Sequence, residues 1–238
     1  MYSPDGASVY HDFTLRDTSE VRDILREVRA CDGPVLELAA GAGRLTVPLL
    51  SLRRDVTAVD LSSSMLALLR ARLTALPRAL VGRCTTVQAD IADYAVAEQV
   101  GVAVLGTSSV SLLTDDHRRA MLRRTRDNLR PGGAFILTTA QISERTADLT
   151  ERVFDVTGVS GTVHRVHDLV AADRCGRYTV VITPGDGTPR TVCHSFIRVV
   201  PPTELTADLA AAGFHVESTI TLPGERYTSV LVRAVREG

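Results

Sequence analysis

The stretch VLELAAGAGRLTVPLL, residues 35–50, places two glycines and one carboxylate, Glu37, inside the most apolar part of the chain. Its first four residues predict a short buried strand, and the apolar pattern of residues 44–52 predicts a helix. Gly41 and Gly43 lie between the two. Glycine lets the backbone approach a ligand closely, and the free N–H groups at the start of a helix can donate hydrogen bonds to it. The stretch therefore predicts a strand–turn–helix unit that binds a small molecule.

The alternation of strand and helix continues on both sides of this unit. Short apolar or β-branched runs predict further strands at residues 55–60, 85–89, 100–105 and 134–139. Amphipathic or capped segments predict helices at residues 19–31, 62–76 and 114–129. Because strands that alternate with helices pair in parallel, we expect an α/β fold with a doubly wound, Rossmann-like, mostly parallel sheet.

The pattern changes after residue 140. Segments that alternate or are rich in β-branched residues predict an antiparallel β insertion after the fifth strand, at residues 153–156, 162–169, 177–183 and 191–199. A helix at residues 202–212 and strands at 215–217 and 229–235 follow. We therefore expect three parts: an N-terminal lid helix and cofactor-binding core (1–140), a substrate-side β insertion (141–200), and a helix and strand pair that complete the core (201–238).

Composition excludes several classes of function. The net charge of −1 argues against a nucleic-acid partner, because phosphate binding needs a concentrated positive surface. All 27 basic residues are arginine, so no catalytic lysine is available. The four cysteines are widely scattered without a C-x-x-C pair, which favours free thiols and no metal site. We see no secretory signal and no membrane-spanning run, so we expect a cytoplasmic protein without a membrane partner.

Two carboxylates indicate which cofactor the glycine turn serves. Asp60 ends the second predicted strand, where a doubly wound fold accepts hydrogen bonds from ribose hydroxyls, so a nucleotide-like cofactor is indicated. The dinucleotide pattern G-x-G-x-x-G has Thr46 in its third position here, which disfavours NAD and FAD. Glu37 would repel a pyrophosphate, but it suits a ligand that carries an ammonium and a sulfonium. Those are the charges of S-adenosylmethionine (SAM).

Four segments in order resemble the motifs of class I SAM-dependent methyltransferases. LELAAGAGR resembles the E/D-x-x-x-G-x-G signature, VTAVDLSSSML the second motif and VQADIADY the third, and LRPGGAFIL resembles the turn before the fifth strand. The resemblance implies the class I methyltransferase fold, SAM as cofactor and S-adenosyl-L-homocysteine (SAH) as product. It implies contacts to the ribose from Asp60 and to the adenine from Asp90. The cofactor-binding residues that we expect are Tyr10, Glu37, Ala39, Gly41, Gly43, Asp60, Leu61, Met65, Asp90, Ile91, Gly106 and Thr107.

The acceptor side is predicted from position and from the same resemblance. Residues 106–109 follow the fourth strand, at the sheet edge that borders the methyl-transfer pocket in this family. The segment around Tyr10 resembles the N-terminal lid of small-molecule methyltransferases, and the β insertion roofs the acceptor site in similar enzymes. We expect substrate contacts from His11, Ser108, Ser109 and Tyr227. The candidate catalytic residues are His164, His194 and Tyr10, and no metal is expected.

A narrower resemblance concerns the substrate. The segment CHSFIRVVPPTELTADLAAAGFHVE is similar to the tail of aminosugar N,N-dimethyltransferases and of N-methyltransferases that act on ribosomal peptide natural products. The N-terminal segment VYHDFTLRDTSEVRDILREVR and the motifs after it look like methyltransferases of daptide-type peptide biosynthesis. These resemblances imply N-methylation, including N,N-dimethylation, of a peptide or small-molecule amine. The β insertion could also make a homodimer contact.

Four alternatives stay open at the level of the sequence. An O-methyltransferase could use the same scaffold, and an aminosugar N,N-dimethyltransferase could share the tail. A NAD-dependent oxidoreductase is disfavoured by Glu37 and Thr46 but belongs to the same fold class. A non-catalytic SAM-binding subunit would bind the cofactor and release no SAH.

Overall fold

The structure is a computed structural model that describes residues 4–15, 18–143, 151–172, 175–184, 191–222 and 227–238. Its centre is a seven-stranded sheet in the order β10-β11-β5-β4-β1-β2-β3. These strands are β1 (Val35–Leu38), β2 (Val56–Asp60), β3 (Cys84–Gln88), β4 (Val100–Leu105), β5 (Leu129–Ile142), β10 (Phe214–Leu222) and β11 (Tyr227–Arg236). Strands β1 to β5 pair in parallel, whereas β10 and β11 are antiparallel. The predicted class I methyltransferase fold is confirmed.

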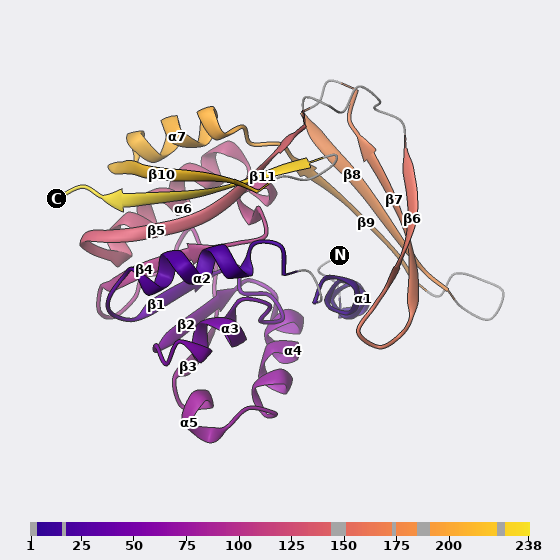
Figure 1. The fold of residues 1–238 in the computed structure, drawn as a ribbon, viewed down its shortest axis with the longest axis horizontal. Helices are drawn as coiled ribbons and strands as arrows, with labels where there is room; N and C mark the ends of the chain where they lie inside the picture. Colours follow the sequence, from indigo (N-terminus) through magenta and orange to yellow (C-terminus); the bar gives the residue numbers. More distant parts are fainter. Residues whose placement is uncertain (1–3, 16–17, 144–150, 173–174, 185–190, 223–226) are drawn as a thin grey trace.

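Helices cover both faces of this sheet (Figure 1). Buried side chains of α2 (Val21–Arg29), α3 (Thr46–Ser51) and α4 (Ser63–Leu73) form one apolar cluster with the strands. Those of α6 (Asp115–Asn128) and α7 (Pro202–Ala211) form the other. A short helix, α5 (Arg78–Val81), precedes β3, and a 3-10 turn, η1 (Ser109–Leu112), follows β4. The two clusters bury the sheet on both sides, which explains why its central strands are almost entirely apolar.

A second sheet stands beside the core (Figure 1). It has four antiparallel strands in sequential order: β6 (Arg152–Thr157), β7 (Val163–Val170), β8 (Gly176–Thr183) and β9 (Thr191–Arg198). The predicted antiparallel insertion after the fifth strand is therefore confirmed. We call it the side sheet. The N-terminal helix α1 (Pro4–Thr14) lies between it and the core, with contacts to β9 and α4.

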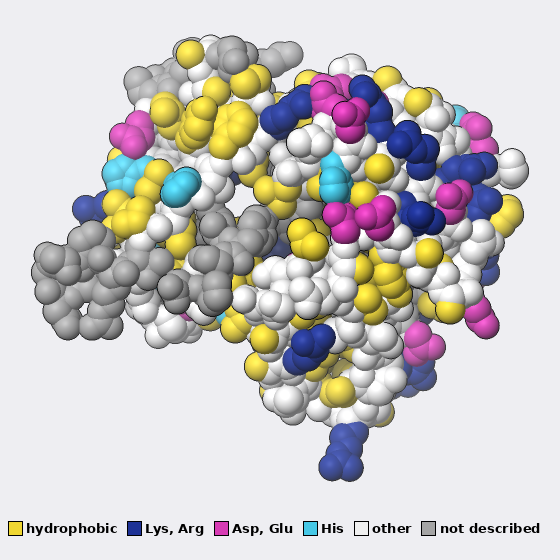
Figure 2. All heavy atoms as spheres, turned by 180° about the vertical axis from the view of Figure 1, so that it is seen from behind, with side chains coloured by type: hydrophobic (Ala, Val, Ile, Leu, Met, Phe, Trp, Pro, Cys, Tyr) yellow, Lys and Arg dark blue, Asp and Glu magenta, His cyan; other side chains and the backbone are white. Residues whose placement is uncertain are grey.

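The two faces of the side sheet differ. Val166, Val181 and Cys193 pack on Val9 of α1, on the inner face. Side chains alternate along a strand, so their neighbours in sequence point to the outer face. Exposed apolar side chains on that outer face are Val153, Val163, Leu169, Tyr178, Val192 and Phe196. Hydrophobic side chains gather on this part of the surface, which a hollow separates from the core (Figure 2).

Several segments differ from the sequence prediction. Residues 4–14, placed before the first predicted helix, form α1, because their burial comes from the side sheet, which lies far along the chain. β5 is longer than its apolar core at both ends, since it pairs with β4 from Leu129 and with β11 as far as Ile142. In the part of the chain that the structure describes, no helix is long and apolar enough to span a membrane.

Candidate functional site

A cavity of about 770 Å³ opens at the carboxyl ends of β1, β2, β3 and β4 and beneath α1. This edge of a doubly wound sheet is where such folds bind ligands. Eleven of the residues predicted from the sequence line it: Tyr10, His11, Ala39, Gly41, Asp60, Leu61, Met65, Asp90, Ile91, Thr107 and Ser109. Segments spread over more than 100 residues of sequence therefore meet in one cavity, which we call the main cavity.

The two glycines of the opening motif have different surroundings. Both have the positive φ angles that disfavour other residues, +56° at Gly41 and +83° at Gly43. A Cβ on Gly41 would meet no protein atom within 4 Å, so this glycine faces the open cavity. A Cβ on Gly43 would lie 2.4 Å from Cδ1 of Leu69 in α4. Gly41 thus leaves room for a ligand, and Gly43 lets the turn pack on a helix.

Asp60 connects the end of β2 to the glycine turn. Its Oδ2 accepts a hydrogen bond from the Gly41 N–H at 2.8 Å, and its Oδ1 accepts one from the Ser62 N–H at 2.8 Å. Burial raises the pKa of Asp60 above its usual value, although these two N–H groups act in the opposite direction. Each carboxylate oxygen can accept a second hydrogen bond. Asp60 lines the main cavity and fits the ribose role predicted for it.

Glu37 lies beneath the glycine turn rather than on the cavity lining, and only 2% of its surface is exposed. Its Oε2 has no hydrogen-bond partner among the described residues. Burial raises the pKa of Glu37 to about 8, with smaller opposing effects of Thr46 and Arg44. A cation in the cavity above would favour the ionised form of this carboxylate. The orphaned acid therefore fits a positively charged ligand better than a pyrophosphate.

The opposite end of the main cavity contains a histidine that the sequence analysis missed. Oδ1 of Asp90 accepts a hydrogen bond from the Ala92 N–H at 2.8 Å and lies 2.8 Å from Nε2 of His117. Burial acts to raise the pKa of Asp90, but the Ala92 N–H and His117 together lower it below its usual value. His117 belongs to the first turn of α6, and its sequence context, TDDHRR, reads as an ordinary helix start. The contact between Asp90 and His117 exists only in the folded chain.

Apolar side chains lie beside Asp90. Met65 and Ile91 are almost completely buried, Leu61 is exposed, and all three line the main cavity. A planar base can pack against such a wall while Asp90 accepts its amino group. The donors, acceptors and apolar wall together fit a nucleoside that carries an amino-acid cation, as SAM does.

A second, smaller cavity of about 170 Å³ lies between the core and the side sheet. Ser108 and Tyr227, both predicted as substrate contacts, line it, and it shares Arg44 and Thr107 with the main cavity. Glu20 links the two residues that the cavities share. Glu20 accepts hydrogen bonds from the Thr107 N–H at 2.6 Å and from Arg44. The sequence analysis missed Glu20 and Arg44, since a salt bridge between segments 24 residues apart leaves no local pattern.

Four further predicted residues lie away from the lining of the main cavity. Gly43, described above, packs on α4, and a Cβ on Gly106 would lie 2.4 Å from Cδ1 of Leu45. Gly106 thus supports the cavity from behind. The candidate bases His164 and His194 line neither cavity among the described residues. His164 is buried on the inner face of the side sheet and bonded to Asp12, and strand alternation sends His194 to the outer face. The geometry therefore does not support a catalytic role for either histidine.

Comparisons with known proteins agree with this geometry. The family described as a methyltransferase domain matches residues 35–133, which hold the first three predicted motifs and the start of the fourth. A search of curated proteins found no match. The glycopeptide N-methyltransferase MtfA, solved with SAH, is 34% identical; the match covers 92% of this chain and 86% of that chain, with a TM-score of 0.69. The same enzyme was also solved with SAM.

More distant structures show the fold alone. The CcbJ methyltransferase from Streptomyces caelestis is 22% identical, with a TM-score of 0.77 and coverage of 92% of this chain and 90% of that chain. CalS10, an amino pentose methyltransferase from Micromonospora echinaspora, is 19% identical, with a TM-score of 0.69 and coverage of 95% of each chain. By its motifs, its cavity and its likeness to MtfA, the chain belongs to the class I SAM-dependent methyltransferases.

Proposed function

We propose that this methyltransferase transfers the methyl group of SAM to an amine of a peptide natural product or a related specialised metabolite. The observation that carries the proposal is the pair of cavities that meet at Thr107 and Arg44. One suits the cofactor, and the other offers an approach for an acceptor. The likeness to a glycopeptide N-methyltransferase over most of the chain supports an amine acceptor.

The residues of the main cavity would hold SAM in one orientation. Asp60 would accept the ribose hydroxyls, and Asp90, held by Ala92 and His117, would accept the adenine amino group. Glu37 would stabilise the positive end of the cofactor from below the glycine turn. When bound, SAM supplies a methyl group on a sulfonium, so the carbon is already activated. The chain then has to position the nucleophile in line and remove its proton.

His11 is the side chain best suited to take that proton. It lines the main cavity, and its Nδ1 is buried without a hydrogen-bond partner among the described residues. Burial and the positive charge of Arg72 lower the pKa of His11 below its ordinary value, although Asp12 acts in the opposite direction. A neutral imidazole can accept a proton from an amine that approaches the methyl group. We propose that His11 does so, with Tyr10 beside it in the lining.

Mass spectrometry of acceptors tests the proposal. The purified protein and SAM are incubated with peptides that carry a free amine and with amino sugars, and the same compounds with acetylated amines serve as controls. We expect a mass increase of one or two CH2 groups on free amines, accompanied by SAH release and absent from the acetylated controls. Methylation of a hydroxyl in place of the amine, or binding of SAM without SAH release for any acceptor, would contradict it.

A further inference from the structure

Helix α1 is a wall of the main cavity on one side and is attached to the side sheet on the other. Tyr10, His11 and Thr14 line the cavity. Val9 packs on Val166, Val181 and Cys193 of the side sheet, which gives the helix a small apolar contact. Polar contacts to the side sheet add to this apolar contact and contribute to the position of α1.

Asp12 supplies those polar contacts. Its Oδ2 lies 2.7 Å from Nε2 of His164, and its carboxylate accepts hydrogen bonds from the N–H and the hydroxyl of Ser160 at 2.7 and 2.8 Å. The backbone carbonyl of Asp12 also accepts the Val159 N–H at 3.0 Å. A single residue of α1 is therefore bound by strand β7 and by the turn before it.

His164 is fixed in the orientation that this contact needs. Only 2% of its side chain is exposed, and its Nδ1 lies 3.0 Å from Oγ1 of Thr183 on β8. The other ring nitrogen, Nε2, therefore points at Asp12, and the pairing of β7 with β8 holds His164 in this position. Burial acts to raise the pKa of Asp12, but the hydrogen bonds from His164 and Ser160 lower it below its usual value, so the carboxylate is ionised. A hydrogen bond to an ionised carboxylate is stronger than a neutral one.

The turn between β6 and β7, which packs against Asp12, also has no room for a side chain at Gly158. A Cβ on Gly158 would lie 2.0 Å from Oδ2 of Asp12. Gly158 does not have a positive φ, so its backbone is compatible with alanine and the strain of a substitution would fall on the carboxylate of Asp12. This glycine offers a way to displace Asp12 without changing α1 itself.

We propose that Asp12 and His164 are positioning residues, whose hydrogen bond holds α1 on the side sheet so that Tyr10 and His11 face the cofactor. Retention of the cofactor then depends on the side sheet, although none of the described residues of its strands lines the main cavity. The inference rests on the proposed placement of SAM in that cavity. It gives His164 a purpose that its sequence position alone did not indicate.

Calorimetry with SAH tests the proposal, with three variants that reach the pair from different elements. Asp12→Asn, His164→Ala and Gly158→Ala should each weaken SAH binding about tenfold, the effect of losing a hydrogen bond to a charged group. His164→Gln should lose less than His164→Ala, because its amide can still donate to Asp12. Since the two residues act as one pair, adding Asp12→Asn to His164→Ala should weaken binding no further.

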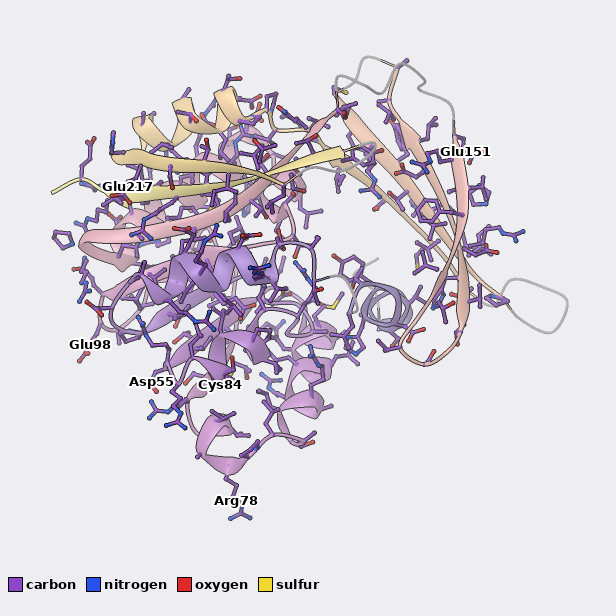
Figure 3. The ribbon with its side chains drawn as sticks, in the orientation of Figure 1. Asp55, Arg78, Cys84, Glu98, Glu151 and Glu217 are labelled. Carbon is purple, nitrogen blue, oxygen red and sulfur yellow. The ribbon has the colours of Figure 1, made fainter. Side chains whose placement is uncertain are left out.

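His167→Gln is the matched control. His167 lies on the same strand, β7, but faces outward and bonds to Glu151 at 2.8 Å. Glu151 lies on the side of the sheet away from α1 (Figure 3). This variant also changes a hydrogen bond of the side sheet to a carboxylate, and it should bind SAH as the wild type does. Equal loss in the control would show that any weakening of the sheet suffices, and would overturn the proposal.

Hydrogen exchange separates positioning from general destabilisation. Amides of α1 should exchange faster in Asp12→Asn and Gly158→Ala, while amides of β7 and β8 keep wild-type protection. Wild-type SAH affinity in both variants, or equal loss of protection in α1 and the strands, would overturn the proposal. If the wild type does not bind SAH but α1 still opens faster in the variants, the proposed cofactor placement fails and the pair is left as an anchor of α1 alone.

Discussion

Two side chains of the site have properties that burial creates, Glu37 and His11. Glu37 is the one acidic residue in the apolar stretch 35–50, and burial raises its pKa to about 8. His11 has a lowered pKa for the same reason, strengthened by Arg72. A buried acid that keeps its proton and a buried base that stays neutral are common devices of active sites. Each makes a prediction at the scale of the residue.

Glu37 should make stability fall as the pH rises from about 4.5 to about 8. The folded state binds a proton on Glu37 in this interval and the unfolded chain does not, so unfolding releases it, at up to about 1.4 kcal/mol per pH unit. In Glu37→Gln this contribution is absent. Urea denaturation at pH 5 and pH 8 should therefore show wild type losing stability relative to the variant. A difference between the two proteins that stays constant with pH would contradict the burial of an acidic Glu37.

His11→Gln should lower kcat and leave the KM for SAM nearly unchanged. Loss of a proton acceptor costs about 100-fold or more in rate, whereas glutamine keeps a side chain of similar size in the cavity wall. His117→Gln is the control, because its position beside Asp90 predicts a raised KM for SAM with little change in kcat. The measurement is steady-state kinetics with an acceptor identified by mass spectrometry. An unchanged kcat in His11→Gln would exclude it as the base.

Sequence reasoning found the site residues that lie at or just after the end of a strand, because each of these residues has a fixed place in a motif that follows the strand. Asp60 and Asp90 were found in this way, and both line the cavity. His117 and Glu20 were missed, since each acts through a partner that only folding brings near. His164, a candidate base from the sequence, bonds to Asp12 and lines neither cavity among the described residues, because a histidine in a strand does not reveal which partner folding brings to it; its catalytic role stays a prediction.

At the scale of the element, the turn after β1 separates ligand binding from packing. Gly41 faces the cavity, whereas Gly43 touches Leu69 of α4. To test whether Gly41 serves ligand binding and Gly43 serves packing, each glycine is replaced by alanine. Both variants lose about 1 kcal/mol or more from the positive φ angle alone.

Gly41→Ala should weaken SAH binding with a modest loss of Tm, because its methyl group enters the cavity. Gly43→Ala should lower Tm further, because Leu69 is fully buried and has little space to move away. Calorimetry with SAH and thermal unfolding of both variants make the comparison. The reverse ranking, with Tm lower in Gly41→Ala, would show that the roles of the two glycines are exchanged.

Helices α6 and α7 are joined by a buried arginine. Arg118 is fully buried, and its guanidinium donates to Asp208 at 2.8 Å and to Glu204 at 2.5 Å. Arg118→Ala should cost about 3–5 kcal/mol, since it leaves a largely buried Asp208 with only the half-exposed Arg119 beside it. Arg165→Ala, which removes an exposed ion pair with Asp155, should be neutral. Urea denaturation of both measures the difference, and a neutral Arg118→Ala would refute the proposed link between the helices.

Elements with a regular apolar pattern were predicted well, and elements held by distant contacts were not. The parallel strands at 35–38 and 100–105 were located from their apolar runs alone and agree with β1 and β4. Helix α1 has no comparable pattern, because among its described side chains it is Val9 that packs on the apolar residues of the side sheet, which lie far along the chain. The extension of β5 depends on β11, nearly 100 residues later, and no local signal reveals it.

At the scale of the whole molecule, the site lies where two sheets and one helix meet. The central sheet supplies Asp60 and Asp90, α1 supplies Tyr10 and His11, and the side sheet supplies the anchor for α1. A class I core would bind a nucleoside at the same edge with any covering element. The side sheet therefore reaches the site through α1, and its geometry could be read only from the folded structure.

Calorimetric titration of the pure protein tests the central claim most directly. The wild type is titrated with SAH and with NAD, and the variant Asp60→Asn is titrated with SAH. We predict one saturable SAH site in wild type, no heat with NAD, and a loss of SAH affinity of at least about tenfold in Asp60→Asn, whose thermal unfolding stays cooperative. Tight binding of NAD without binding of SAH, or wild-type affinity for SAH in Asp60→Asn, would contradict the placement of a methyl donor across the edges of β1 and β2.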